Sequence, residues 1–198
     1  MEEEIAKTLQ HFEQSNTDIQ AHLKLFYINS AEQVEYTAAD GTKSQYLLVK
    51  LPFRSLGAFR KVGKQVIDHL EAKFKWPVVL AANRTIISTR GKYRWSICSN
   101  ALYSVSNIFL AIHHASQKRP RSRTLKAVHQ ALLDDIVAPS AITGRTVRVA
   151  TNGKRTEKIF LDPLDRELME PRLDAMSHAY AKLTTHNVVF DFSKPTSF

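Results

Sequence analysis

The stretch Val147–Pro163, VRVATNGKRTEKIFLDP, decides the fold class of this chain. Asn152-Gly153 lies between two β-prone runs and is the strongest short pattern for a β-hairpin, because these residues accept the positive φ angles of a tight turn. Asp162-Pro163 marks the start of a helix over about 164–183, since proline fits the first helical turn. The apolar run at 188–192 predicts a final strand. This part of the sequence therefore predicts a hairpin followed by a helix and a strand.

Upstream, helices and strands also alternate in mixed order. Helical spacing of apolar residues predicts helices over 2–13, about 18–28, about 55–74 and about 124–137, the last of them stopped before Pro139. Strands are expected at 33–36 and 46–49, on either side of the turn Asp40-Gly41, and at 78–81. Pro52 should end the 46–49 strand. The prediction is an α+β or mixed α/β fold, with hairpins and a short mixed sheet packed with long helices. No internal sequence repeat is visible.

The charge of the chain predicts a polyanionic partner. The 198 residues are 43% hydrophobic and 24% charged, which is typical of a globular protein, and the formal net charge is +9. The excess is uneven. Residues 1–40 carry two Lys and eight Asp or Glu, a net of −6; residues 41–99 carry twelve cations and two acids, a net of +10. We therefore expect nucleic acid as the partner, and we expect contact with phosphate from the middle of the chain rather than from its amino-terminal segment.

Several functional classes are not supported by the sequence. Cys98 is the only cysteine, which excludes an internal disulfide, and no apolar run is long enough to span a bilayer. The acidic start, Met1–Glu4, is unlike a signal peptide, so a cytosolic or nuclear location is expected. The histidines lack metal-ligand spacing, and no phosphate-binding loop or dinucleotide fingerprint is present. We expect no cofactor and no enzymatic activity.

The densest basic cluster is Lys118–Lys126, KRPRSRTLK, in which five of nine residues are cations and none is an acid. Arginine suits phosphate because its planar guanidinium donates two parallel hydrogen bonds, and the start of the following helix adds backbone N–H donors. A solvated linker or a nuclear import signal is the alternative. A second basic stretch would extend the surface if the two lie close in space. The candidate RNA-binding residues are Lys118, Arg119, Arg121, Arg123 and Lys126, with Arg84, Arg90, Lys92 and Arg94 in the second stretch.

The run KRPRSRTL at 118–125, followed by Ala127-Val128-His129 and by Gly144-Arg145-x-Val147-Arg148-Val149, resembles the eukaryotic-type ribosomal protein S7e family. The resemblance covers 118–192 well and 5–90 weakly. It implies an α/β fold and a structural role in the small ribosomal subunit, with small-subunit rRNA and neighbouring ribosomal proteins as partners. It also implies a part in nucleolar subunit assembly and rRNA maturation, followed by residence on the cytoplasmic ribosome. Neither a membrane nor an obligate homo-oligomer is expected.

Three regions follow from these patterns: residues 1–90, an atypical segment 91–117, and residues 118–198. Family members resembling this chain have a shorter, Lys- and Arg-rich connection where this chain has 23 uncharged residues at 95–117. The segment is a lineage-specific insertion, a helix that docks on a neighbour, or translated intron sequence, since Gly91-Lys92-Tyr93 is what the donor-like string GGTAAGTAT encodes. Sequencing the mature transcript across these codons separates the last alternative from the others.

Two rival functions use the same basic surface. The chain could be a transient RNA chaperone or assembly factor that leaves the finished particle, or an interaction module that docks on an acidic protein. Stoichiometric retention in purified particles distinguishes a resident protein from a visitor. Complexes that survive ribonuclease would favour the docking module.

Overall fold

The computed structural model describes residues 2–16, 19–38, 41–87, 119–153 and 155–192. The chain divides into two compact units. The larger unit comprises Met1–Asn83 and Ala131–Phe198, and the smaller comprises Arg84–Gln130. Helix α5 (Leu125–Val137) begins in the smaller unit and ends in the larger one. The larger unit contains two three-stranded sheets.

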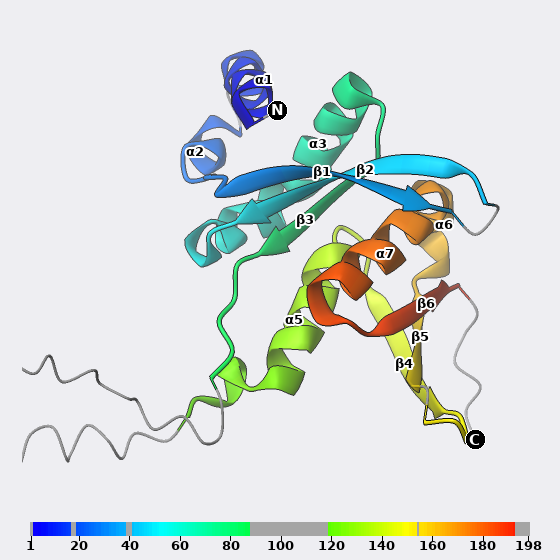
Figure 1. The fold of residues 1–198 in the computed structure, drawn as a ribbon. Helices are drawn as coiled ribbons and strands as arrows, with labels where there is room; N and C mark the ends of the chain where they lie inside the picture. The colour runs from blue at the N-terminus through cyan, green and yellow to red at the C-terminus, as the bar shows by residue number, and fades with distance from the viewer. Residues whose placement is uncertain (1, 17–18, 39–40, 88–118, 154, 193–198) are drawn as a thin grey trace, which may run out of the picture. The chain divides into compact units, whose positions relative to one another are not determined.

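The first sheet and its crossover helix form a ββαβ unit (Figure 1). Strands β1 (Ser30–Thr37) and β2 (Lys43–Leu51) form an antiparallel hairpin. Helix α3 (Leu56–Phe74) then leads to β3 (Val78–Ala82), which pairs with β2 in parallel. Before this sheet come α1 (Glu2–Ser15) and the short α2 (Gln20–Leu23). Proline cannot donate to a ladder, and β2 ends at the residue before Pro52, as predicted.

The second sheet has the same order and strand directions. Strands β4 (Ile142–Val149) and β5 (Arg155–Leu161) are antiparallel, and β6 (Asn187–Asp191) pairs with β5 in parallel. The crossover consists of α6 (Arg166–Met169) and α7 (Leu173–Thr184). The larger unit thus contains one topology twice, although the sequence shows no repeat.

The two ββαβ units also share their turn devices. Gly41 (φ 79°) and Gly153 (φ 77°) occupy the left-handed region in the two hairpin turns, where glycine carries no Cβ penalty. Each donates its N–H, over 2.9 Å, to the carbonyl three residues earlier. Lys75 (φ 59°) and Thr185 (φ 61°) end α3 and α7 with the same left-handed cap. The repetition therefore lies in backbone conformation rather than in side-chain identity.

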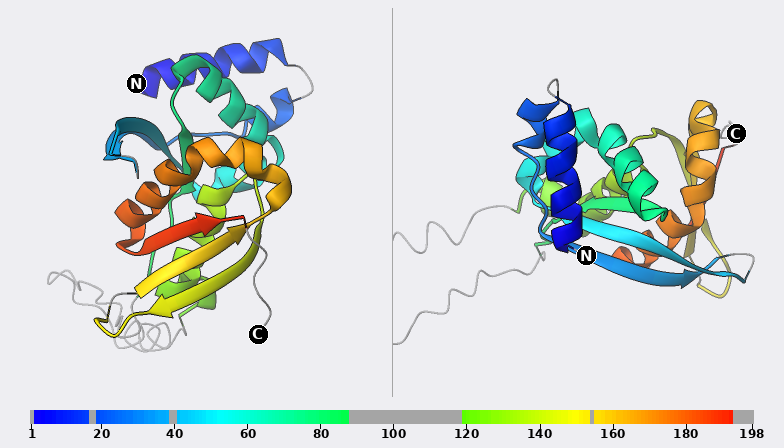
Figure 2. Two further views of the ribbon diagram at one scale, coloured as in Figure 1. Left: turned by 90° about the vertical axis from the view of Figure 1, so that its right-hand side faces the viewer. Right: turned by 90° about the horizontal axis from the view of Figure 1, so that it is seen from above.

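The two sheets differ in how many faces they bury. On β2, Leu47, Val49 and Leu51 pack with α3, whereas Tyr46 and Leu48 face a second core. That second core also contains residues of α5, α7 and the second sheet. Figure 2 shows these layers from two further directions. The first sheet is therefore covered on both faces.

The second sheet contributes only one face to the shared core. Ile159 and Leu161 of β5 are buried there, with Val188 and Phe190 of β6 beside them. Alternate residues point to the opposite face, where Val189 is 50% exposed, whereas Phe160 is 6% exposed and has Lys158 Nζ 5.3 Å from its ring centroid. The second sheet is thus an outer layer of the larger unit.

The mixed α+β architecture and both hairpins are confirmed, but two helices differ from the prediction. The helix expected over 164–183 is interrupted by a 3₁₀ turn at Glu170–Arg172, because Pro171 has no N–H for the helical ladder. The helix expected over 18–28 is limited to Gln20–Leu23. Beyond it the backbone bonds elsewhere: Tyr27 N–H donates to Ser55 Oγ at 3.1 Å, and Asn29 N–H donates to the Lys50 carbonyl at 2.9 Å.

Candidate nucleic-acid interface

The described part of the basic cluster forms the entry to α5. Arg121–Arg123 make one 3₁₀ turn after Pro120, and Thr124 follows in an extended conformation. The Thr124 hydroxyl donates to the Arg121 carbonyl at 2.8 Å and accepts from Ala127 N–H at 3.4 Å, so this residue caps the helix. The cations therefore stand immediately before a helix amino terminus, which is favourable for an anion.

The segment that carries Arg84 lies beside this cluster within the smaller unit. Ile87 N–H donates to the Arg123 carbonyl at 3.0 Å, and Arg119 Nη1 donates to the Ile87 carbonyl at 2.7 Å. Arg84 precedes Ile87 by three residues and is half-buried. These bonds bring the segment that carries Arg84 next to the described part of the basic cluster. They also give Arg119 a structural role that its place in a basic run did not indicate.

Three candidate residues are both exposed and uncompensated. The side chains of Arg121, Arg123 and Lys126 are exposed. Over the described residues, none of the three forms an ion pair with a carboxylate. Their charge is therefore available to an external anion. The remaining candidates, Arg90, Lys92, Arg94 and Lys118, lie outside the described residues.

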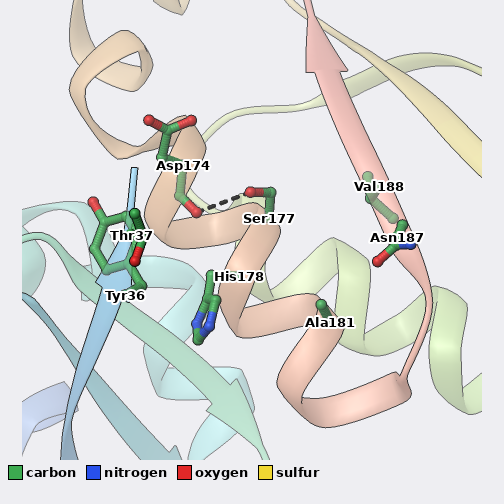
Figure 3. A pocket seen from close by; sticks show the side chains of 8 residues that line it. All are labelled: Tyr36, Thr37, Asp174, Ser177, His178, Ala181, Asn187 and Val188. Atoms are coloured by element: carbon green, nitrogen blue, oxygen red, sulfur yellow. Dashed lines mark hydrogen bonds between the residues drawn. The ribbon is translucent and has the colours of Figure 1, made fainter. Parts of the chain in front are cut away.

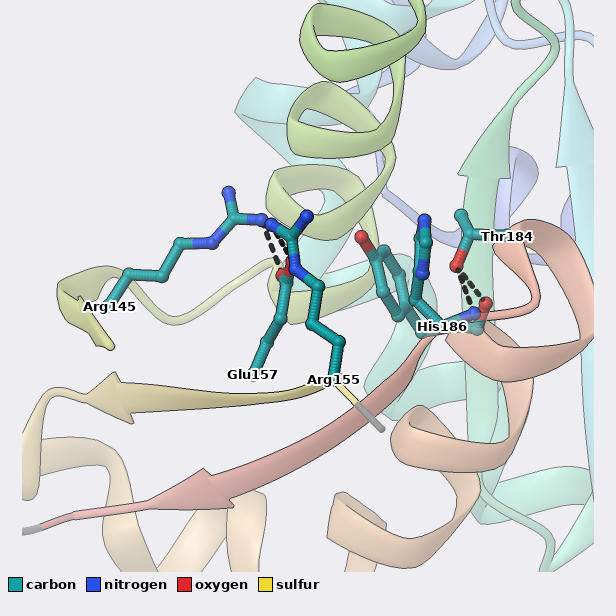
Figure 4. A network of polar contacts seen from close by, with 6 residues as sticks. Arg145, Arg155, Glu157, Thr184 and His186 are labelled. Atoms are coloured by element: carbon teal, nitrogen blue, oxygen red, sulfur yellow. Dashed lines mark hydrogen bonds and ion pairs between the residues drawn. The ribbon is translucent and has the colours of Figure 1, made fainter. Parts of the chain in front are cut away.

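Several arginines of the larger unit are neutralised internally instead. Arg145 and Arg155 both bind the carboxylate of Glu157, which is only 3% exposed (Figure 4). Arg172 is 5% exposed and pairs with Asp68 at 3.5 Å and with Glu71. Each of these cations compensates a carboxylate within the fold. Basic composition alone could not separate them from the available cations.

Sequence reasoning also missed a polar cavity of about 310 Å³ in the larger unit (Figure 3). It lies among residues of β1, α7 and β6, which no sequence spacing connects. Two of its residues are already engaged: the Ser177 hydroxyl donates to the Asp174 carbonyl at 2.9 Å, and His178 Nδ1 lies 3.1 Å from the Tyr46 hydroxyl. No serine–histidine hydrogen bond is present in this cavity, so it lacks the nucleophile–base pair of a hydrolase. Its lining residues are Tyr36, Thr37, Asp174, Ser177, His178, Ala181, Asn187 and Val188.

Perturbed pKa values belong to packing and ion pairing. Burial raises the pKa of Tyr46 to about 12, with smaller contributions from Glu32 and Tyr36. Hydrogen bonds from Lys50 and Lys182 lower the pKa of Glu32 on the surface of β1. Among the described residues there is no group of three metal-ligating side chains. Within the same ranges, no helix is both long and apolar enough to cross a membrane.

Comparison with known proteins decides the family. The model of the family described as ribosomal protein S7e matches residues 1–192. This chain belongs to the ribosomal protein S7e family. The resemblance seen in the basic cluster and in Gly144–Val149 is thereby confirmed over nearly the whole chain.

Individual relatives match along almost their full length. The small ribosomal subunit protein eS7z of Arabidopsis thaliana is 34% identical, over 97% of this chain and 88% of its own. The eS7 protein of Schizosaccharomyces pombe is 35% identical, over 97% and 87%. The eS7B protein of Saccharomyces cerevisiae is 31% identical, over 100% and 92%. Membership in a family of ribosomal proteins confirms the expectation of a structural, non-enzymatic protein.

Proposed function

We propose that this chain is a structural constituent of the small ribosomal subunit and binds small-subunit rRNA through the exposed cations at the entry to α5. Family membership supports a place in the small ribosomal subunit, because the relatives are named as small ribosomal subunit proteins. The observation that carries the RNA surface is the contrast in ion pairing: Arg121, Arg123 and Lys126 are exposed without carboxylate partners among the described residues.

The mechanism is charge neutralisation with shape matching rather than reading of bases. Each lysine or arginine that neutralises a phosphate releases a condensed counterion, so affinity falls as salt rises. Arg119, tied to the Ile87 carbonyl, fixes the backbone that presents the free side chains. The candidate residues outside the described ranges, Lys118 among them, would extend this surface. Neighbouring ribosomal proteins are the expected protein partners, with assembly in the nucleolus and residence on the cytoplasmic ribosome, and no obligate homo-oligomer.

Sedimentation tests the residence of the protein. A tagged chain in cell extract should travel with the small subunit and polysomes, at one copy per particle, through a sucrose gradient at high salt. Release to the top of the gradient would instead identify a transient assembly factor. Particle association that persists after ribonuclease digestion of the exposed RNA would favour docking on an acidic protein.

Charge neutralisation tests the surface. Arg121→Gln, Arg123→Gln and Lys126→Gln together should reduce the affinity of the full chain for small-subunit rRNA at least about tenfold. They should also lower the salt slope by about one per lost contact. The matched control removes three paired lysines, Lys50, Lys158 and Lys182, and therefore changes the net charge equally. Equal losses in the two triple variants would reject this surface.

A further inference from the structure

A groove of about 530 Å³ lies between α1 and α3 in the larger unit. Its size falls within the range of about 300–1,000 Å³ that is usual for small-ligand sites. No other part of the proposed function uses it. The groove is lined by Lys7, Thr8 and His11 of α1 and by His69, Ala72 and Lys73 of α3.

The floor of the groove is apolar and fixed. Thr8 is 3% exposed, and its hydroxyl donates to the carbonyls of Glu4 and Ile5 inside the helix, so it is already satisfied. The His69 ring stacks on Phe12 of α1, with ring centroids 4.6 Å apart and planes 27° apart. This contact holds an imidazole at the groove and joins the two helices.

The rim of the groove is cationic although residues 1–40, which include α1, carry a net charge of −6. Over the described residues, neither Lys7 nor Lys73 forms an ion pair, and the lining contains no acid. Asp68 and Glu71 of α3 pair with Arg172. Glu3 and Glu4 lie one helical turn before Lys7 and Thr8 on α1. The acidic start of α1 therefore borders the groove at one end but does not line it.

We propose that this groove binds one unpaired nucleotide of RNA. The base lies over the imidazoles and methyl groups of the groove, and the flanking phosphates meet Lys7 and Lys73. Unpaired bases are bound in this way in proteins, by stacking on ring faces and by cations along the backbone. A phosphate alone would need the lysines but not the apolar floor, whereas an apolar peptide would need the floor but not the cations. The proposal rests on the proposed function, because it assigns a second RNA contact to the same protein.

Two variants of the full chain remove the two parts of this site. Lys7→Gln with Lys73→Gln removes the rim charges, and His69→Ala removes the ring. The control, Arg60→Gln with Lys64→Gln, removes the same two charges from exposed positions of α3 outside the groove lining. The probes are a single-stranded oligouridylate of about twelve nucleotides and an RNA duplex of equal length, whose bases are already stacked. Circular dichroism and thermal unfolding identify any variant that misfolds.

We expect the lysine pair to weaken oligouridylate binding about five- to tenfold, and His69→Ala to weaken it about threefold or more. Duplex binding should change less than twofold in His69→Ala, and the control should stay within about twofold for both probes. Oligouridylate affinity that is unchanged in the lysine pair, or reduced equally in the control, would overturn the groove. If the unmodified chain binds neither oligonucleotide nor small-subunit rRNA, the proposed function fails as well. If only the α5-entry variant loses affinity for small-subunit rRNA, nucleotide binding in the groove is rejected and the proposed function stands.

Discussion

The two ββαβ units of the larger unit share one topology and differ in what covers them. In both, the face that packs on its own crossover helix is buried, as Leu51 of β2 and Leu161 of β5 show. The other face of the first sheet packs on α5, α7 and the second sheet. The other face of the second sheet carries the half-buried Lys158, the exposed Val189 and the buried Phe160, and it lies outside the shared core. The same ββαβ topology thus forms a central layer and an outer layer. The position of each sheet among the layers of the larger unit decides which of its residues can carry a charge.

The largest expected effect comes from breaking the ion pairs that link the two ββαβ units. Arg172, at the crossover of the second unit, pairs with Asp68 and Glu71 of α3 in the first. Glu71 also accepts from Val78 N–H at 3.0 Å, which connects the pair to β3. Arg172→Met should cost about 3 kcal/mol in the free energy of unfolding, because the Glu71 carboxylate, whose side chain is 23% exposed, loses its buried partner. Urea denaturation measures this loss.

The control is Arg166→Met in the same crossover. Arg166 pairs with Glu170 over 3.7 Å, both side chains are more than 60% exposed, and the guanidinium lies 5.9 Å from the Phe192 ring centroid. Its loss should cost less than about 1 kcal/mol. Similar costs for the two variants would show that the link between the units contributes no more than a surface pair.

Alkaline pH should weaken the core that the two ββαβ units share, because Tyr46 is fully buried there. Burial raises its pKa from 10.0 to about 12. The unfolded chain therefore loses this proton first, and the stability that the neutral phenol contributes is complete below pH 10 and lost as the pH rises toward 12. The loss amounts to about 2–3 kcal/mol. The stability difference between the unmodified chain and Tyr46→Phe, measured by urea denaturation from pH 8 to 12, should shrink accordingly; parallel curves would contradict it.

A matched pair of valines compares the two sheets directly. Val79 lies opposite Leu48, and Val189 lies opposite Lys158, at equivalent places in the two registers. Val79 is 2% exposed and Val189 is 50% exposed. Val79→Ala should cost about 2 kcal/mol and Val189→Ala less than about 0.5 kcal/mol. Equal losses in chemical denaturation would mean that the outer face of the second sheet is also covered.

The smallest expected difference between two variants tests what the two ββαβ units have in common. Gly41 and Gly153 have nearly the same positive φ, and an added Cβ would meet no atom within 4 Å at either position. Alanine should therefore cost only its left-handed backbone strain, about 1–2 kcal/mol. Thermal unfolding of Gly41→Ala and Gly153→Ala should give losses within about 0.5 kcal/mol of each other. A clear difference would show that the two turns are not equivalent.

Much of the fold was predictable because its evidence is local. The turns at Gly41 and Gly153 and the strand end before Pro52 follow from conformational limits of single residues. The interruption at Pro171 was predictable in principle, since proline in a helical pattern marks a break. The early end of α2 was not, because it depends on hydrogen bonds to Ser55 and Lys50.

The candidate site was predictable only in part. The basic run identified Arg121, Arg123 and Lys126, which are exposed. It did not distinguish them from Arg119, whose side chain is half-buried. The Ile87 carbonyl that engages Arg119 lies 32 residues away along the chain. The groove between α1 and α3 was not predicted, since Lys7 and His11 of α1 lie about 60 residues from His69 and Lys73 of α3 along the chain and converge only when the helices pack.

The sequence by itself determined the turns, most of the helices and strands, the family and the excess of positive charge, because each rests on neighbouring residues or on composition. Only the tertiary structure decided that one ββαβ unit is repeated, which of its sheets is buried twice, and which cations are free. The physical reason is distance along the chain. Arg172 meets its carboxylates 104 and 101 residues earlier, and a charge is neutralised by what packs beside it in space.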